Sequence, residues 1–427
     1  MSASAPRTGY HLDFWLVFTA TSAIGVAANL FVFFPVYIVR LGGGAASIGA
    51  IVSVGALAAL AARPSLVPLI ERRGRRSVAL WSMMLEALAI VLYIPVHALG
   101  WPIYAVRVLH GVADGTARVA LFALVFDILP QGRRGEAMAL FSLSGQGPAA
   151  VGPPIGEALL KYFGFAVFFY VAAMLCLVAA AATAMLPQDR REDPRKDPRK
   201  DPRKDPREDR HHENRREDRR SEERSKDAPA QSSAPVAASG YRALIFDRKL
   251  LPLWVVAFAF AFVLAARLSF VAPFAYEKNI AQVGWYFALY SGIAVALRLF
   301  GGKVLDRVGV ERILGPSMGL LGLGVSTLAL TGISGALLGA AVLGGVGHSY
   351  AYPALSAMII AHTPADSFGR SSVVYTSLFD CAAMAAPYLL GIVATLWGYA
   401  WMFFVAGLVS IGAAVYFSAT ERRKMEL

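Results

Sequence analysis

Long apolar stretches alternate with short polar segments along most of this chain. They predict helices over residues 13–38, 46–70, 77–98, 102–129, 135–160 and 165–187, and a second set over 250–275, 283–304, 312–331, 335–361, 371–396 and 399–418. An apolar run of about 18 residues or more is long enough for an α-helix to cross the hydrocarbon core of a bilayer. The pattern therefore predicts an all-α membrane protein with twelve transmembrane helices.

The composition supports a membrane protein over a soluble one. Of the 427 residues, 56% are hydrophobic and 16% are charged, and the mean hydropathy is +0.53. Soluble domains carry about 25% charged residues. The net charge of +12 would suit a nucleic-acid partner. However, the basic residues lie in short loops between apolar stretches, which favours the lipid bilayer as the partner and no nucleic acid.

The loops differ in charge between the two sides of the expected membrane. The loops around Gly100, Ile333 and Gly398 carry no charge. The basic residues of the opposite loops are Arg72, Arg73, Arg75, Arg76, Arg133, Arg134, Arg307, Arg312, Arg370, Arg422, Arg423 and Lys424. Because basic loops stay on the cytoplasmic side, we expect a multi-pass protein of the inner (cytoplasmic) membrane with both termini in the cytoplasm.

One strongly polar stretch interrupts the apolar pattern. Residues 188–240 repeat Asp-Pro-Arg-Lys, and between Asp189 and Asp227 they hold 16 basic and 14 acidic side chains, a net of +2. A segment with almost no apolar residues cannot bury a core and is expected to be disordered. We therefore expect a six-helix bundle at 1–187, a charged cytoplasmic linker at 188–245 and a second six-helix bundle at 246–427.

The two halves share an internal repeat. At an offset of 234, V-L-H-G-V-A-D-G-T-A-R-V-A-L (108–121) aligns with V-L-G-G-V-G-H-S-Y-A-Y-P-A-L (342–355), with seven of fourteen positions identical. At an offset of 235, four residues of the first half align with four of the second: Arg63, Glu71, Arg72 and Gly74 with Arg298, Asp306, Arg307 and Gly309. Such self-similarity indicates the duplication of one structural unit.

The loop after the second helix of each half resembles a motif of the major facilitator superfamily. That family carries G-x-x-x-D-R-x-G-R-R at this place, and the chain has V-P-L-I-E-R-R-G-R-R at 67–76 and G-G-K-V-L-D-R-V-G at 301–309. The first copy departs from the motif at Val67 and Glu71. Arg107 and Gly111 also match the R-x-x-x-G of the family's fourth helix. The resemblance implies two six-helix bundles around a central cavity, as in bacterial sugar- and drug-efflux members.

Three charged residues of the fourth predicted helix share one face. At 100° per residue, Asp114 lies about 20° to one side of Arg107 and Arg118 about 20° to the other. A charge at the centre of a membrane helix costs roughly 2.5–3.5 kcal/mol, so it normally faces a cavity or a partner. We expect these residues to line a cavity for substrate or protons, with Asp114 as the proton carrier. The alternative is a charge network that only fixes helix packing.

The repeat extends this candidate cavity to the tenth predicted helix. His348 aligns with Asp114, and Tyr352 aligns with Arg118. An imidazole has an ordinary pKa near 6.5, which suits proton exchange. A histidine on a helix is also often a purely structural group, so both readings of His348 stay open.

Three further residues complete the expected cavity. The resemblance implies that helices one, four, seven and ten line it, which adds Asn29 and Arg267, residues that face each other when Pro35 is aligned with Pro273. Asp380 of the eleventh helix either pairs with Arg267 or acts as a second titrating carboxylate. The sequence does not decide between these two roles.

The resemblance also implies a cytoplasmic gate. In the family, an acid at the cytoplasmic end of the fourth helix pairs with arginines of the loop motif, which makes Asp127 the expected partner of Arg72 and Arg75. The network would keep the cytoplasmic face closed in one state of the transport cycle. The expected gate residues of the two halves are Glu71, Arg72, Gly74, Arg75, Asp127, Asp306, Arg307 and Gly309.

Other polar residues of the helices have no assigned role at this stage. The sequence leaves open whether Arg63, Arg298 and Glu86 reach the cavity. Glu157 and Lys161 are spaced as an i, i+4 pair and are expected to be structural. The only two cysteines, Cys176 and Cys381, are too few for a disulfide framework or a zinc site, and no metal site is expected.

These features favour a secondary transporter that moves a small organic solute by alternating access. We expect proton-coupled efflux by a monomer, with the solute and protons as partners. The arginines are compatible with an anionic or zwitterionic solute, and the alternative is that they are neutralised within the protein. The sequence contains no phosphate-binding loop, so ATP is not expected to drive transport, and neither an enzymatic activity nor a cofactor is expected. A solute sensor with a transporter fold and a lipid flippase are the alternatives.

Overall fold

The computed structural model describes residues 12–128, 134–187, 238–280, 282–300, 302–330, 335–364 and 367–425, and all regular structure in these ranges is helical. The first half contains α1 (Leu12–Leu30), η1 (Phe31–Phe33), α2 (Phe34–Arg40), α3 (Ala45–Arg73), α4 (Arg75–Val91), α5 (Trp101–Ile128), α6 (Arg134–Tyr162) and α7 (Gly164–Ala184). The second half contains α9 (Ala238–Ile245), α10 (Leu251–Glu277), α11 (Val283–Phe300), α12 (Gly302–Val308), α13 (Val310–Thr327), η4 (Leu328–Leu330), α14 (Ala336–His362) and α15 (Phe368–Met425).

The all-α fold predicted from the sequence is confirmed. Helix is present in each of the twelve predicted ranges. Within the described part of the chain, seven helical segments are long and apolar enough to cross a membrane. The total of twelve membrane crossings stays a prediction.

Three predicted boundaries differ from the structure. The helix expected over 77–98 ends at Val91 and continues as turns, since Pro95 disfavours helical geometry in the residue before it. The helix expected over 283–304 is divided into α11 and α12. Element α15 contains the last two predicted helices, which are separated at Gly398 (φ 84°, ψ 165°) as predicted, and its second part runs seven residues beyond the predicted end at 418.

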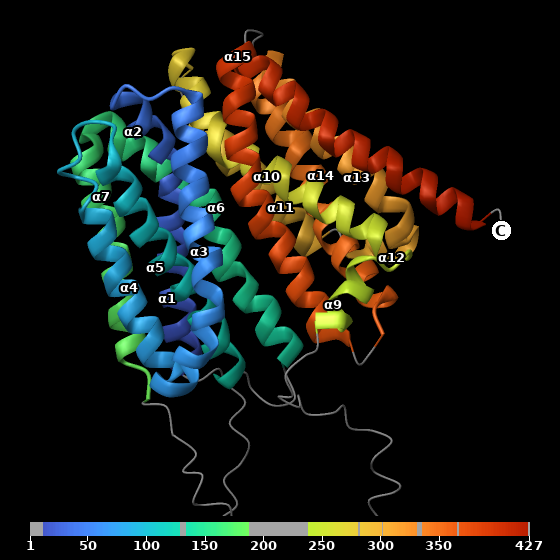
Figure 1. Ribbon diagram of the computed structural model, residues 1–427, viewed down its shortest axis with the longest axis horizontal. Helices are drawn as coiled ribbons and strands as arrows, with labels where there is room; N and C mark the ends of the chain where they lie inside the picture. Colours follow the sequence, from blue (N-terminus) through green and yellow to red (C-terminus); the bar gives the residue numbers. More distant parts are fainter. Residues whose placement is uncertain are drawn as a thin grey trace, which may run out of the picture.

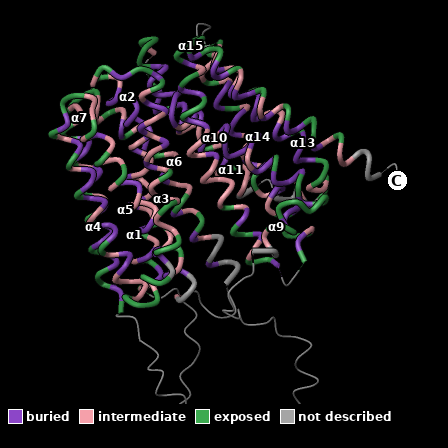
Figure 2. The backbone as a smooth tube through the Cα atoms, viewed as in Figure 1, coloured by how far each residue is buried: buried purple, intermediate pink, exposed green. Residues whose placement is uncertain are grey.

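The helices pack as two groups that follow the two halves of the chain (Figure 1). In the first half, α1 packs against α6 and α7, and α5 packs against α3 and α4. In the second half, α13 lies against α14, and α15 lies against α10 and α13. Buried residues follow the interior of both groups, and exposed residues follow their outer faces (Figure 2). The groups meet chiefly where α3 contacts α15 and α6 contacts α11.

The contact of α3 with α15 depends on a glycine. A Cβ atom at Gly49 would lie 2.2 Å from the carbonyl oxygen of Pro387, closer than any real contact. Small residues allow membrane helices to bring their backbones together in this way. Nearby, the Ala46 amide donates a hydrogen bond of 3.0 Å to Oγ1 of Thr395, and the Ser53 hydroxyl donates one of 2.6 Å to the carbonyl of Met384.

One carboxylate of α6 also binds α11 directly. Glu157 accepts hydrogen bonds from the amides of Val283, at 2.9 Å, and Gly284, at 2.7 Å. These are the first two residues of α11. Amides at a helix N-terminus have no partner within the helix, and the helix dipole favours a negative charge there. Glu157 therefore caps a helix of the opposite half, a role that the sequence spacing with Lys161 did not suggest.

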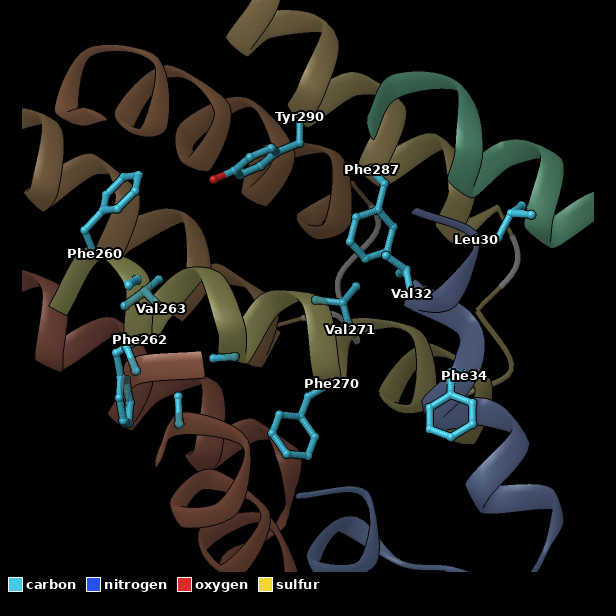
Figure 3. Packing of buried hydrophobic residues seen from close by; sticks show 14 of the residues in the cluster. Leu30, Val32, Phe34, Phe260, Phe262, Val263, Phe270, Val271, Phe287 and Tyr290 are labelled. Atoms are coloured by element: carbon cyan, nitrogen blue, oxygen red, sulfur yellow. The ribbon is translucent and has the colours of Figure 1, made fainter. Parts of the chain in front are cut away.

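Helix α10 runs through the middle of the second half and is apolar around most of its circumference. Its buried residues include Val263, Phe270 and Val271, and Figure 3 shows Phe287 and Tyr290 extending toward it from α11. A helix that is apolar on all sides is one enclosed by other helices or by lipid. This helix contributes Leu268 and Ser269 to the cavity described below.

The predicted linker lies mostly outside the described residues. Of the range 188–245, only the last eight residues are described, and they form the short helix α9 where we expected disorder. Leu244 of α9 is buried, and its carbonyl accepts a hydrogen bond of 3.1 Å from the indole of Trp254. The apolar residues of α9 therefore give it a surface to pack on, which the polar sequence before it does not have.

Candidate functional site

A polar cavity lies between the two halves. Two adjoining hollows of about 340 and 300 Å³ share the side chains that form it. Ligand sites commonly have volumes of about 300–1,000 Å³. The shared lining comes from α3, α5 and α10: Val52, Arg107, His110, Asp114, Arg118, Leu268 and Ser269. Because both halves contribute, a solute in this cavity would contact both.

Asp114 and Arg118 form an ion pair in the cavity. The Arg118 guanidinium donates two hydrogen bonds of 2.8 Å, one to each carboxylate oxygen of Asp114. The two residues are one helical turn apart on α5, which brings their side chains to the same face. Two parallel hydrogen bonds fix the geometry of the pair.

Arg107 lies about two turns before Asp114 and three before Arg118 on α5, above an aromatic ring. Its guanidinium carbon is 5.2 Å from the centre of the Phe34 ring. A Cβ atom at Gly111 would lie 2.2 Å from the Gly55 carbonyl oxygen, and one at Gly55 would lie 2.5 Å from Nε of Arg107. The two glycines therefore let α3 and α5 touch and leave room for the arginine. Gly111 belongs to the predicted motif, whereas Gly55 was not singled out.

His110 is a cavity residue that the sequence analysis missed. Its Nδ1 lies 3.3 Å from the Tyr93 hydroxyl and 3.4 Å from Nη1 of Arg107, and its ring packs edge-on against Phe31. His110 is three residues from Arg107, so it stands at the edge of the charged face of α5. This position on the helix could have identified His110 from the sequence.

Glu86 lies behind His110, away from the cavity. Its side chain is 1% exposed, and one carboxylate oxygen is 4.0 Å from Nε2 of His110. The second oxygen has no hydrogen-bond partner among the described residues. The question left open by the sequence is thus answered for this state: Glu86 does not line the cavity, and His110 separates the two.

Asn29 lines the cavity from α1, opposite the residues of α5. Its side-chain amide donates a hydrogen bond of 2.8 Å to the carbonyl of Gly25 on the preceding turn. This bond uses one of the two donor hydrogens, so the amide can still offer a donor and an acceptor to a solute.

The candidate residues of the second half form a separate aromatic cluster. Arg267 is 6% exposed, and its guanidinium carbon lies 4.0 Å from the Tyr290 ring centre and 5.2 Å from that of Phe287. The Tyr290 hydroxyl is 3.0 Å from Nδ1 of His348. Arg267 and His348 are not among the residues that line the cavity, although Leu268 and Ser269 beside Arg267 are.

Tyr352 joins the same cluster through Phe260, whose ring centre lies 5.1 Å from that of His348 and 6.1 Å from that of Tyr352. The guanidinium carbon of Arg298 lies 5.1 Å from the centre of the Tyr352 ring. Aromatic faces attract cations, so Arg267 and Arg298 are each stabilised by the rings beside them. Nε of Arg267 and Nε of Arg298 have no hydrogen-bond partner among the described residues.

Asp380 does not pair with Arg267. One of its carboxylate oxygens lies 2.6 Å from Nη1 of Arg63, and the other accepts a hydrogen bond of 3.0 Å from Nη2. This ion pair joins α3 to α15 and therefore connects the two halves. In this state Arg63 therefore holds the two halves together.

The expected gate residues are described only in part. The side chains of Asp127 and Asp306 lie outside the described residues, so their predicted pairing stays a prediction. Glu71, Arg72 and Arg307 are exposed, and Arg75 donates a hydrogen bond of 3.3 Å to the carbonyl of Ala123 on α5.

The two motif glycines occupy equivalent turns. Gly74 joins α3 to α4 with φ 85°, and Gly309 joins α12 to α13 with φ 90°. Such positive φ values favour glycine because it has no Cβ atom. The matched turns give a physical reason for glycine at this place in both repeats.

A family model supports the doubled arrangement. The model described as Major Facilitator Superfamily matches residues 16–281 and again 274–426. Among curated proteins, the chain is similar to the staphylopine export protein of Staphylococcus aureus (strain Mu50), with 21% identity over 93% of this chain and 91% of that protein.

Solved transporter structures share the fold. The nucleoside transporter NupG superposes with a TM-score of 0.72 at 12% identity, covering 96% of this chain and 98% of that one. A POT family transporter in complex with a thioalcohol-conjugated peptide gives a TM-score of 0.68 at 14% identity, covering 96% and 95%. At these identities the likeness concerns the fold alone.

Proposed function

The chain belongs to the Major Facilitator Superfamily and is a multi-pass membrane transporter, and we propose that it exports a small anionic or zwitterionic organic solute in exchange for protons. The observation that carries this proposal is the Asp114–Arg118 pair inside a cavity built by both halves. A titratable carboxylate and a cation at one place can bind a proton and a solute in alternation.

The charges of the cavity support the proposed class of solute. Arg107 and Arg118 face the cavity with Asp114 as the one carboxylate among its described lining residues. Arginine binds carboxylates and phosphates through two parallel hydrogen bonds. A solute carboxylate would therefore be attracted to these guanidinium groups, and an amino group on the same solute would be attracted to Asp114.

The same pair suggests how protons could drive transport. While Arg118 holds Asp114, the carboxylate is kept charged. A solute amino group that binds Asp114 needs the carboxylate in its charged form, and a proton on the carboxylate removes that charge. Proton and amino group would then compete for Asp114, which is the requirement for an exchange mechanism. His110, with Glu86 behind it, is a second group through which a proton could reach the cavity.

Export is favoured by the similarity to a bacterial export protein along almost the whole chain. We propose that both termini face the cytoplasm, which puts Ala45 and Val283 at the outer face. The contacts made by Gly49 and Glu157 then close the outer side, so the cavity would be loaded from the cytoplasm. Asp127, Arg72 and Arg75 would close the cytoplasmic side in the opposite state.

Reconstituted protein tests the proposal. A thermal-shift screen of anionic and zwitterionic solutes identifies a ligand, and proteoliposomes loaded with that labelled solute measure its movement with and without a pH gradient. We expect transport that accelerates when the gradient is imposed. Binding without any transport would instead identify a solute sensor, and movement of labelled lipid in place of solute would identify a flippase.

A further inference from the structure

A second hollow lies on the flank of the second half, far from the charged face of α5. It has a volume of about 650 Å³, within the range of small-molecule sites. Helices α9, α10 and both parts of α15 form its walls. Its lining includes Tyr241, Trp254, Phe258, Leu378, Ala413 and Tyr416, and nearly all of the remaining lining residues are also apolar.

All walls of this hollow belong to one end of the molecule. α9 precedes α10 directly, and the lining residues of α10 lie within its first nine residues. Those of α15 lie close to its start and close to its end. The hollow is thus at the α9 end of the second half (Figure 1), which is the inner leaflet if the termini are cytoplasmic as proposed above.

Helix α9 has the character of an interfacial helix. Tyr241 and Ile245, four residues apart, line the hollow, and Leu244 is buried against Trp254. The exposed side of the segment carries Arg242, and beyond it Phe246 is 67% exposed. Helices with one apolar face and basic residues on the other lie at the boundary between headgroups and acyl chains.

Positive charge is concentrated beside the opening of the hollow. Arg242, Arg248 and Lys249 are all exposed between the start of α9 and the start of α10. The acid in the same segment, Asp247, is engaged with the chain itself, since it accepts hydrogen bonds from the amides of Lys249 and Leu250. Basic residues next to the membrane attract anionic headgroups.

We propose that this hollow binds one anionic phospholipid of the adjacent leaflet. An acyl chain occupies the apolar space between α9, α10 and α15, and the headgroup phosphate lies by Arg242, Arg248 and Lys249. The lipid thereby joins α9 to both ends of α15. The site is separate from the solute cavity, so this proposal does not depend on what is transported.

Cys381 offers a direct probe because it lines the hollow, whereas Cys176 is fully buried. Purified protein in detergent is given phosphatidylglycerol or phosphatidylcholine, and the rate of maleimide labelling is followed, with Cys381→Ser as the blank. We expect phosphatidylglycerol to slow labelling and phosphatidylcholine to have a much smaller effect. Equal rates with no lipid and with phosphatidylglycerol would overturn the proposal.

A variant that fills the hollow separates the site from general lipid effects. Gly412 lines it, and a Cβ atom there meets only open space, so Gly412→Phe should fold and occupy the place of the acyl chain. Gly319→Phe on α13 is the matched control, since its Cβ atom also meets open space and it lines no part of this hollow. Native mass spectrometry should detect retained phosphatidylglycerol on wild type and control but not on Gly412→Phe. Equal retention by all three would place the lipid elsewhere and refute the site.

The headgroup contact is tested by charge removal. Each basic residue near an anionic headgroup should strengthen binding about fivefold. We therefore expect Arg242→Gln and Lys249→Gln each to weaken phosphatidylglycerol binding by about that factor, while Lys278→Gln, at the opposite end of α10, leaves it unchanged. If phosphatidylcholine bound as tightly as phosphatidylglycerol, the proposed recognition of an anionic headgroup would be wrong.

Discussion

Arg63 of α3 and Asp380 of α15 join the two halves through two contacts, of 2.6 and 3.0 Å, between guanidinium and carboxylate. Both side chains are partly exposed, and exposed ion pairs contribute only about 0.2–1 kcal/mol. In a transporter whose halves rock against each other, even this amount is enough to change how often each state is occupied.

Removing this pair is expected to favour the state in which α3 and α15 separate. Asp380→Asn should change the ratio of the two states by up to about fivefold. Spin-label distances between the end of α3 near Arg73 and the start of α15 near Phe368 measure the ratio. The exchanged pair, Arg63→Asp with Asp380→Arg, serves as the control and should restore the wild-type distribution; if it does not, the pair has another role.

Glu157 is expected to hold the opposite side closed. Glu157→Ala removes the acceptor for the amides of Val283 and Gly284. Loss of a helix cap typically costs about 1 kcal/mol, so closure at this end of the molecule should become about fivefold less favoured. Labels on the first residues of α3 and α11 would report the opening. Glu277→Gln, an exposed acid at the same end, is the control and should have no effect.

Asp114 is expected to couple transport to protons. In Asp114→Asn proteoliposomes, exchange of labelled for unlabelled solute should persist, because Arg107 and Arg118 remain, while acceleration by a pH gradient should disappear. A gradient-driven rate equal to that of wild type would show that Asp114 is not the proton carrier. The pair His110→Asn and Glu86→Gln would then be the next variants to examine.

Glu86 is expected to tolerate loss of its charge but not its reversal. A carboxylate that is 1% exposed is tolerated only when a partner or a proton compensates for its charge. Glu86→Gln keeps the shape and should unfold within a few degrees of wild type. Glu86→Lys puts a third cation near Arg107 and Arg118 and should prevent folding. Thermal unfolding in detergent, followed by tryptophan fluorescence, compares the two.

Gly111 is expected to be essential for the contact of α3 with α5. Gly111→Val directs methyl groups into the Gly55 backbone, and such overpacking typically destabilises by about 1–3 kcal/mol. Gly147→Val on α6 adds the same groups where a Cβ atom meets open space. A lower melting temperature for Gly111→Val alone would support the tight packing, whereas equal values for both variants would contradict it.

Much of the architecture follows from two simple sequence patterns, the apolar stretches and the internal repeat. Apolar stretches located the helices because a membrane helix must satisfy its backbone internally over its full length. The offset repeat matched Gly74 with Gly309, and the structure gives both the same positive φ. The break at Gly398 was also predicted, whereas the end of the helix expected over 77–98 was not, because a single residue, Pro95, decides it.

The candidate site was predictable where it rests on one helix and not where it rests on several. Arg107, Asp114 and Arg118 share a face of α5, which helical periodicity alone reveals. The partner of Asp380 could not be found this way, because Arg63 lies 317 residues away on another helix. The repeat also suggested that Arg267 would face the same cavity as Asn29, yet in this state it packs against aromatic rings of its own half.

The cap that Glu157 provides also has a consequence for how the protein is made. Its partner Val283 is 126 residues later in the chain, so the ribosome completes the first bundle well before α11 is inserted. During that interval the Glu157 carboxylate lacks the Val283 and Gly284 amides, which belong to the second bundle. A newly made first bundle therefore already carries a hydrogen-bond acceptor for the second bundle. The same contact favours association of the two bundles when they are expressed as separate chains in one membrane.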